Sequence, residues 1–291
     1  MGAGDSGTIA SSARFGTASR ATPPRGDFFA LPGDFVQRYI WVATYVRGAR
    51  VLESGSDFGA GASYLAEHGA RTVLGLVSDR PGVEYAERRY GRSNLRFDVA
   101  EAVDGGLPSE AFDVVVSFGV LEHTSDPEAY LGGLRDALRP GGRCFLATTN
   151  PQFRERTGRS AARQGHPFIR EYEAEELAGL VSRFFDIQGL YGQTRLVDHE
   201  ANPADDARPS ARRRASNAVR QIVGQPFRSR GWKLRRTTKS PDAVGTWREF
   251  VIEDVRNPAA YAQRYPVQLV RCVRRSRALP TTANSSGFQE G

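Results

Sequence analysis

The chain has 291 residues, of which 40% are hydrophobic, enough for one large α/β domain with a sizeable core. Its two cysteines, Cys144 and Cys272, stand in unrelated contexts, so we predict neither a disulfide framework nor a metal site, and we expect a cytoplasmic protein. No apolar run has the length of a membrane span and the N-terminus lacks a secretory signal, so we expect no membrane association.

The net charge of +7 is concentrated in one segment. Residues 201–240 contain eleven Arg or Lys and two Asp residues, a net charge of +9, so the rest of the chain carries −2. Residues 193–264, which contain this segment, fit the core pattern poorly, and we predict within them only a basic helix at 209–223 and a strand at 247–255. We predict a disordered tail at 1–33 and a core at 34–192. A basic insertion or lid follows at 193–264, then the last core strand at 265–275 and a second disordered tail at 276–291.

The core begins with a helix, a short strand and a glycine-rich turn. Apolar and aromatic residues recur at helical spacing over 35–46, and the strand 51–52 leads into the acidic residue Glu53. Gly55, Gly59 and Gly61 follow, and then a helix-like stretch at 62–68. This layout places a nucleotide-like ligand at a helix N-terminus, because glycine lets the backbone approach the ligand closely.

Strands and helices then alternate along the chain, which is typical of an α/β protein with a largely parallel sheet. The run 111–118 is almost continuously apolar, as expected of a parallel strand that is buried on both faces. The other strands are predicted at 72–77, 95–97, 143–149, 184–191 and 266–273.

Two of these segments resemble motifs of the class I S-adenosylmethionine (SAM) dependent methyltransferases. The order Glu-x-Gly-x-Asp-x-Gly over 53–59 resembles their motif I, and the run FDVVVSFGVLEH over 112–123 resembles their motif IV. The resemblance covers about 34–193 and the last strand, and is closest to bacterial enzymes for sugars and natural products. It implies a Rossmann-like fold with a seven-stranded, mostly parallel sheet, helices on both faces and SAM as cofactor.

The resemblance also implies a set of cofactor-binding residues. Tyr39 either donates a hydrogen bond to SAM or is a core-facing aromatic of an amphipathic helix. Asp79 either takes the ribose hydroxyls or caps the helix that starts at Pro81. Glu101 either reaches the adenine amino group or is a solvated loop residue. The full predicted set is Tyr39, Glu53, Gly55, Asp57, Gly59, Asp79, Glu101, Ala102 and Phe118.

Three positions depart from the family pattern. Asp57 replaces a motif I glycine, Val77 replaces the acid that ends the second strand, and Gly119 replaces the acid before the sequence VLEH. A second hypothesis follows, in which the chain is a degenerate member with weak or no SAM binding that acts as a non-methylating enzyme or a scaffold.

Two histidines are the candidate catalytic residues. His123 follows the fourth strand, and its ordinary pKa near about 6.5 suits it to deprotonate a hydroxyl group, although a structural role is the alternative. His166 lies in the segment HPFIREY, which ends at Tyr172 and resembles an acceptor lid of the family. The resemblance implies that His166 and Tyr172 contact the acceptor. The alternative is that both side chains pack within the loop.

The leading hypothesis is methyl transfer from SAM to an O or N atom of a small-molecule acceptor, a sugar or a secondary metabolite. Such a displacement needs alignment of acceptor, methyl group and leaving sulfur more than covalent help. A third and weaker hypothesis is a nucleic-acid substrate bound by the basic insertion. The sequence has no acceptor motif of the NPPY type after the fourth strand, so we expect no nucleic-acid partner.

Overall fold

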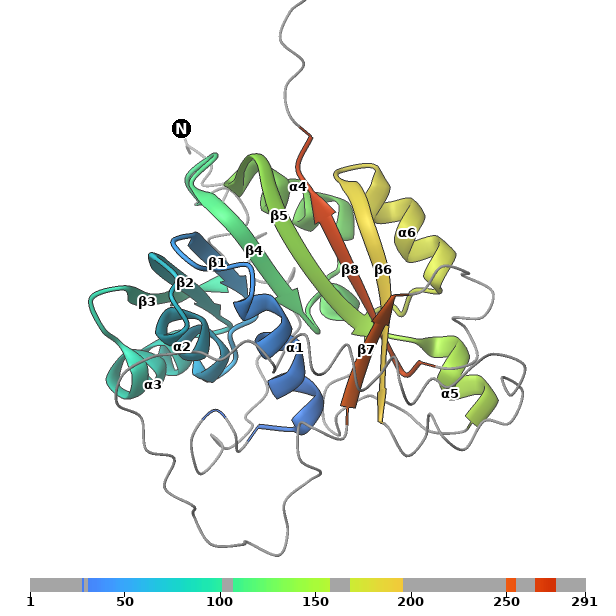
Figure 1. Cartoon of the computed structure of the whole chain (residues 1–291), viewed down its shortest axis with the longest axis horizontal. Helices are drawn as coiled ribbons and strands as arrows, with labels where there is room; N and C mark the ends of the chain where they lie inside the picture. Colours follow the sequence, from blue (N-terminus) through green and yellow to red (C-terminus); the bar gives the residue numbers. More distant parts are fainter. Residues whose placement is uncertain are drawn as a thin grey trace, which may run out of the picture.

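A computed structural model describes residues 28, 31–100, 107–157, 168–195, 250–254 and 265–275. Three of the predicted site residues, Glu101, Ala102 and His166, lie outside these ranges, as do the second predicted tail, most of the first and most of the predicted basic insertion. The first tail was predicted to extend too far, because Phe28 is buried against Tyr64 and α1 begins at Gly33. The described residues form one α/β unit around a single sheet, which Figure 1 shows in chain order from blue to red.

Eight strands form the sheet in the order β3-β2-β1-β4-β5-β8-β6-β7. The strands β1 to β5 are parallel to one another, whereas β8 runs antiparallel to both of its neighbours and β7 runs antiparallel to β6. Their bounds are β1 (Arg50–Ser54), β2 (Thr72–Val77), β3 (Leu95–Val99), β4 (Phe112–Phe118), β5 (Leu138–Thr149), β6 (Asp186–Arg195), β7 (Phe250–Asp254) and β8 (Val267–Val273).

The predicted Rossmann-like fold is confirmed, and one further strand extends its edge. Beyond the seven strands that the family resemblance implies, β7 pairs with the second half of β6, from Tyr191 to Arg195. This pairing is possible because β6 continues to Arg195, four residues past the predicted end of its strand. β7 lies within the range predicted as the basic insertion, at the site of the predicted strand 247–255.

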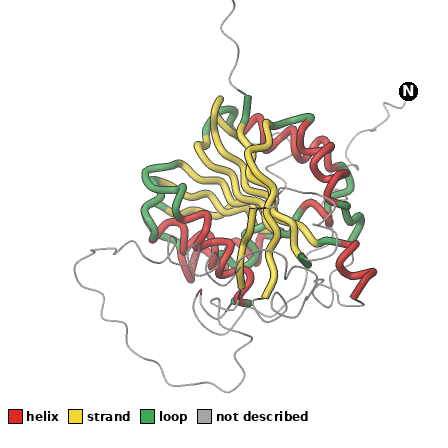
Figure 2. The backbone as a smooth tube through the Cα atoms, turned by 45° about the vertical axis from the view of Figure 1, so that its right-hand side comes forward, coloured by secondary structure: helices red, strands yellow, loops and turns green. Residues whose placement is uncertain are grey.

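Helices cover both faces of the sheet, as Figure 2 shows with the strands between two groups of helices. The sheet residues alternate between two cores, as the period of a strand requires. Val51 and Val114 pack with α1, α2 and α3 on one face, and Leu52 and Val115 pack with α4 and α6 on the other. The bounds are α1 (Gly33–Ala43), α2 (Ala60–Glu67), α3 (Arg80–Tyr90), the 3₁₀ helix η3 (Leu121–His123), α4 (Pro127–Ala137), α5 (Pro151–Thr157) and α6 (Ala174–Ser182).

Two cysteines face one another inside the sheet. Cys144 in β5 and Cys272 in β8 are register partners, both fully buried and not bridged by a disulfide. The Cys272 thiol donates weakly to the Cys144 carbonyl at 3.7 Å, and burial raises its pKa well above the ordinary value. None of the described helices is both long and apolar enough to cross a lipid bilayer.

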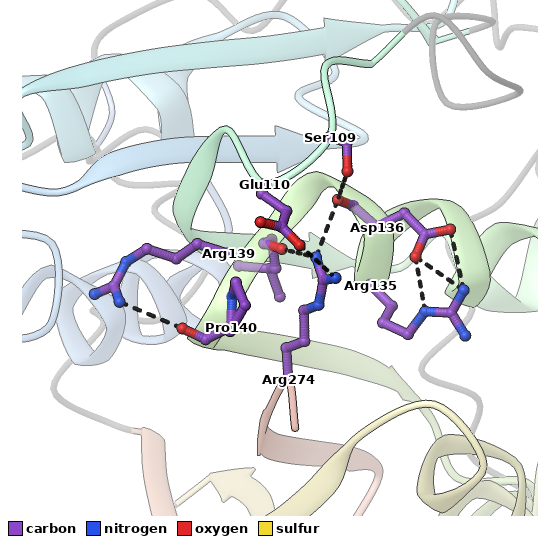
Figure 3. A network of polar contacts seen from close by, with 8 residues as sticks. Ser109, Glu110, Arg135, Asp136, Arg139, Pro140 and Arg274 are labelled. Atoms are coloured by element: carbon purple, nitrogen blue, oxygen red, sulfur yellow. Dashed lines mark hydrogen bonds and ion pairs between the residues drawn. The ribbon is translucent and has the colours of Figure 1, made fainter. Parts of the chain in front are cut away.

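A network of polar contacts lies at the amino end of β5 (Figure 3). Arg274, just after β8, donates to the main-chain carbonyls of Asp136 and Leu138 and, at 2.9 Å, to the Glu110 carboxylate. Ser109 adds a hydrogen bond of 3.3 Å to the Asp136 carbonyl. The network therefore ties the end of the last strand to the loop before β4 and to the end of α4.

A second network at the same end of the sheet joins three parallel strands. The Asp113 carboxylate in β4 accepts from the Arg50 main-chain N–H at 2.8 Å, from the Arg50 side chain at 3.2 Å and from the Arg139 guanidinium. Partial burial alone would raise the pKa of Asp113, but these hydrogen bonds outweigh it and lower the pKa to about 2.

We predict that Asp113→Asn lowers the free energy of unfolding by about 0.5–1 kcal/mol at pH 7. The carboxylate's folded pKa lies below its unfolded value of about 3.9, so its contribution is present above about pH 4 and disappears as the pH falls towards 2. Urea unfolding of the variant and the wild type at several pH values should show the difference shrinking over that range.

The matched control for this prediction is Asp136→Asn, because Asp136 pairs with Arg135 at an exposed position. Its effect should stay within about 0.5 kcal/mol at every pH. A difference between Asp113→Asn and the wild type that is the same at pH 7 and pH 2.5 would contradict the assignment.

Candidate functional site

The glycine turn between β1 and α2 has a backbone that side chains rarely adopt. Gly55 and Gly59 have φ angles of 81° and 89°, in the left-handed region that favours glycine. A Cβ atom on Gly55 would lie 2.3 Å from Cγ2 of Val120, and one on Gly59 would lie 2.7 Å from Cζ of Phe97. Both predicted cofactor-binding glycines are therefore fixed by conformation and by close packing.

Asp57 adopts the left-handed conformation as well, with a φ of 49°. Asp tolerates this conformation better than most residues do, so the replacement of the motif glycine keeps the shape of the turn. The side chain is exposed. Burial is the main cause of the raised pKa values of Tyr39 and Glu53, and the Asp57 charge adds to both.

Glu53, at the carboxyl end of β1, is buried with 1% of its surface exposed. The Ser56 hydroxyl donates to Oε2, whereas Oε1 has no hydrogen-bond partner in the part of the chain that the structure describes. Burial raises the pKa of Glu53, and the Ser56 hydrogen bond to Oε2 opposes this most, followed by the nearby Tyr39 hydroxyl and Ala62 N–H. The unpartnered oxygen is suited to accept a hydrogen bond from a polar ligand.

Tyr39 brings helix α1 to this carboxylate. A Cβ atom on Gly61 would lie 2.2 Å from Cζ of Tyr39 and 2.5 Å from Oε1 of Glu53, so the ring, the glycine and the carboxylate meet at one point. Burial and the Glu53 charge raise the pKa of Tyr39 well above 10, which keeps the hydroxyl protonated as a donor. Tyr39 is thus a buried aromatic residue whose hydroxyl lies beside Glu53.

Phe118 closes the same region from the end of β4. Its ring meets the Tyr39 ring edge-on, with the centroids 5.4 Å apart. In Figure 1, α1 correspondingly lies against the end of β4. The predicted residues Tyr39, Glu53 and Phe118 therefore come together, although they lie on three different elements.

Asp79 caps helix α3, which is one of the two roles considered for it. Its Oδ1 accepts from the Gly82 N–H at 2.8 Å, and Pro81 stands in the first turn. Val77, at the position of the missing acid, is 2% exposed, and a Cβ on Gly82 would lie 2.6 Å from its Cγ1. Val77 is therefore packed against the first turn of α3.

His123 lies in η3 and is half-buried, with its ring centroid 5.4 Å from that of Phe168. Its neighbour Glu122, which sequence analysis did not select, is 3% exposed, and burial raises its pKa. The indication in the sequence was the acidic residue inside VLEH, directly after a buried strand. Glu122 rather than His123 is the buried titratable group of η3.

Arg38 is a second residue that sequence analysis did not select. It is 4% exposed, pairs with Asp34, and donates from Nε to the Gln193 side chain in β6 at 2.7 Å. Gln193 in turn donates to the Asp34 carbonyl and the Gln37 side chain, each at 2.9 Å. The sequence offered only the pair Arg38-Tyr39 as a sign, because Gln193 is 155 positions away.

These groups gather where β1 and β4 end, next to each other in the sheet. Ligands of open α/β sheets bind outside the carboxyl ends of the strands, at the point where the strand order reverses, and β1 and β4 flank that point here. Among the described residues there is no group of three or more side chains that could hold a metal ion. The glycine turn and the unpartnered Glu53 oxygen suit a ligand that approaches the backbone closely and donates a hydrogen bond.

Comparison with known sequences gives the family. The family described as "Methyltransferase domain" matches residues 52–146. A protein of Mycolicibacterium smegmatis named "Probable S-adenosylmethionine-dependent methyltransferase" is 34% identical over 184 residues, 62% of this chain and 67% of that protein.

Two other relatives match over a shorter range. The ubiquinone biosynthesis O-methyltransferase of Dinoroseobacter shibae is 35% identical over 36% of this chain and 42% of its own length. The fatty-acid O-methyltransferase of Mycolicibacterium smegmatis is 32% identical over 37% of this chain and 40% of its own length. The chain thus spans about two-fifths of the length of these two O-methyltransferases.

Solved structures share the fold. A SAM-dependent methyltransferase from Thermotoga maritima has a TM-score of 0.51 at 13% identity, over 83% of this chain and 90% of that one. The [4+2]-cyclase SpnF has a TM-score of 0.50 at 17% identity, over 91% and 87%. With the sequence relatives and the geometry of the turn, these findings show that the chain belongs to the class I SAM-dependent methyltransferases, enzymes whose cofactor is S-adenosylmethionine.

Proposed function

We propose that the chain transfers the methyl group of SAM to an O or N atom of a small molecule, such as a sugar or a secondary metabolite. The observation that carries the proposal is the buried Glu53 with its unpartnered Oε1, next to the glycine turn and under the Tyr39 hydroxyl. The names of two relatives, which act on oxygen, support an O atom as the methyl acceptor.

We assign the amino-acid end of the cofactor to the turn. In this proposal Glu53 accepts a hydrogen bond from the ligand, and the turn backbone at Gly55 and Gly59 approaches it closely, because neither residue has a Cβ atom. Tyr39 and Phe118 exclude water from one side. When bound, SAM supplies an activated methyl group, so the protein's task is to hold and orient an acceptor.

Two further cofactor contacts stay predictions. Glu101 and Ala102, outside the described residues, are proposed to contact the adenine. Asp57 is exposed in the turn, and its charge adds to the raised pKa of the buried Glu53. We therefore propose that the Asp57 side chain borders the ligand.

The proton acceptor of the reaction is proposed among groups near η3. His123 is half-buried there, and its imidazole has the chemistry to take a proton from a hydroxyl group near neutral pH. His166 is kept as the second candidate. The geometry around Glu122 adds a carboxylate to this region.

A non-methylating relative is the second candidate function. It is favoured by Val77 and Gly119, which leave two strand ends without the acids of the family, and by a fold that a [4+2]-cyclase shares. Asp57 does not support it, because its left-handed backbone preserves the turn. The proposed nucleic-acid substrate rests on a basic segment outside the described residues and receives no support from the site.

Calorimetric titration with SAM and with its demethylated product tests the proposal. We expect micromolar binding by the wild type and at least about tenfold weaker binding by Glu53→Gln, since a charged hydrogen-bond acceptor is lost. Glu67→Gln is the control, because Glu67 pairs with Arg92 at the far end of α2 and should not affect affinity. Absence of binding at millimolar SAM by a folded wild-type protein would exclude SAM-dependent methyl transfer.

A pair of variants separates the two roles of Asp79. Asn caps a helix as well as Asp does, so Asp79→Asn should keep the stability, whereas Asp79→Ala should lose about 1 kcal/mol of unfolding free energy. We expect both variants to bind SAM within about twofold of the wild type, as a cap requires. A tenfold loss of affinity in Asp79→Asn, which keeps the cap, would instead assign the Asp79 carboxylate to the ribose.

A further inference from the structure

A buried tyrosine joins the carboxyl ends of β1 and β4, and this contact is here named the Tyr130 bridge. The Tyr130 hydroxyl in α4 donates to Oγ of Ser54 at 2.8 Å and lies 2.7 Å from Oγ of Ser117. Because the phenol gives its one proton to Ser54, the Ser117 hydroxyl donates the second hydrogen bond. The three residues are at most 2% exposed, so water does not compete for these bonds.

The Tyr130 bridge lies where the pairing of β1 with β4 ends. Ser54 and Ser117 are register partners and form the final pair of the two strands. Both chains then leave the sheet through glycines in the left-handed conformation, Gly55 with a φ of 81° and Gly119 with a φ of 72°. The bridge is therefore a side-chain contact between the two strands at the point where their main-chain ladder stops.

The residues next to the two serines face the candidate site. Successive side chains of a strand point to opposite faces of the sheet. Tyr130 packs in the core that α4 and α6 cover, whereas Phe118 and Tyr39 pack in the core on the other face. Glu53 lies on that other face too, because its Oε1 and the Tyr39 ring meet at Gly61. The bridge thus holds the two strand ends from behind the residues of the site.

The polar character of the Tyr130 bridge indicates that it fixes a geometry. The core around it is apolar, and a phenylalanine with two alanines would fill nearly the same volume without burying hydroxyl groups. Since these hydroxyls exchange bonds to water for bonds to one another, their net gain in stability over apolar side chains is small. A buried network whose members are all paired adds rigidity instead, because hydrogen bonds are directional.

The segments beyond the Tyr130 bridge are packed against each other. A Cβ atom on Gly55 would lie 2.3 Å from Cγ2 of Val120, so the two turns have no spare room between them. The N–H groups of Ser56 and Gly119 donate to main-chain carbonyls of β2 and β5 at 2.7 and 2.9 Å, respectively. A shift of either strand end would therefore displace the glycine turn or the start of η3.

We propose that Tyr130 is a positioning residue of the cofactor site, whose hydroxyl holds the ends of β1 and β4 where Glu53 and Phe118 can receive SAM. This rests on the proposed assignment of the amino-acid end of SAM to Glu53 and deepens it. Tyr130 acts through the two strands, because it packs on the opposite face of the sheet. Without its hydroxyl the strand ends are less ordered, and the ligand must order them at a cost in affinity.

Three substitutions separate positioning from stability. Tyr130→Phe leaves two buried serine hydroxyls without their partner, so the melting temperature should fall by about 5 °C and SAM should bind about fivefold more weakly. Adding Ser54→Ala and Ser117→Ala removes the unpaired hydroxyls, so this triple variant should return to within about 2 °C of the wild type. Its affinity for SAM should stay low, because the bridge is still absent. Thermal unfolding and calorimetric titration measure the two effects.

The matched control is Tyr45→Phe. The Tyr45 hydroxyl accepts from Nη1 of Arg271 at 2.8 Å, and Arg271 lies in β8, the third strand from β1 in the sheet. This variant also loses a tyrosine hydrogen bond and stability, but it should bind SAM within about twofold of the wild type. A triple variant that binds SAM as tightly as the wild type overturns the proposal, as does a control that loses as much affinity as Tyr130→Phe.

Amide hydrogen exchange tests the Tyr130 bridge without any cofactor. The N–H groups of Ser56 and Gly119 should exchange about tenfold faster in the triple variant than in the wild type, because the strand ends open more often. Equal exchange rates overturn the proposal and leave methyl transfer untouched. A folded wild type that does not bind SAM would instead refute methyl transfer, whereas faster exchange in the triple variant would still support the bridge as the contact that orders the strand ends.

Discussion

The burial of one carboxylate, Glu53, determines how the carboxyl ends of β1 and β4 are built. A charged group at a buried strand end is costly unless hydrogen bonds compensate it. Ser56 satisfies one oxygen, and Tyr39 from α1 covers the other, which requires a glycine at position 61. The carboxylate is thus surrounded by the glycine turn, by Gly61 at the start of α2 and by Tyr39 of α1. One of its oxygens has no hydrogen-bond partner among the described residues.

The helix that covers Glu53 is itself fixed from the opposite end of the sheet. Arg38 precedes Tyr39 in α1 and is bound to Gln193 of β6, while Phe118 contacts Tyr39 from β4. A residue pair in one helix thereby joins the parallel half of the sheet to its antiparallel half. The added strand β7 extends this second half, and α1 contacts it as well.

Much of the fold and part of the site could be predicted from the sequence. The continuous apolar run of β4 and the turn after β1 have local patterns, so the class of fold and the turn that holds Glu53, Gly55 and Gly59 could be predicted. The left-handed backbone of Asp57 could not be found, because a conformation is not visible in a residue's identity.

Contacts between separated segments were less accessible to sequence analysis for a different reason. Arg38 and Gln193 lie 155 positions apart, and each is an ordinary residue in its own context. Their hydrogen bond depends on how α1 packs against β6, which no local pattern shows. His123, the more reactive residue type, attracted the interpretation instead of the buried Glu122 beside it.

The facing cysteines of β5 and β8 make the centre of the sheet observable. Both thiols are sealed from solvent, and a raised pKa keeps Cys272 in its unreactive protonated form. Both belong to the core that α4 and α6 cover, so a thiol-specific reagent can reach them when these helices move away from the sheet. The labelling rate under native conditions would report how often this face of the sheet opens.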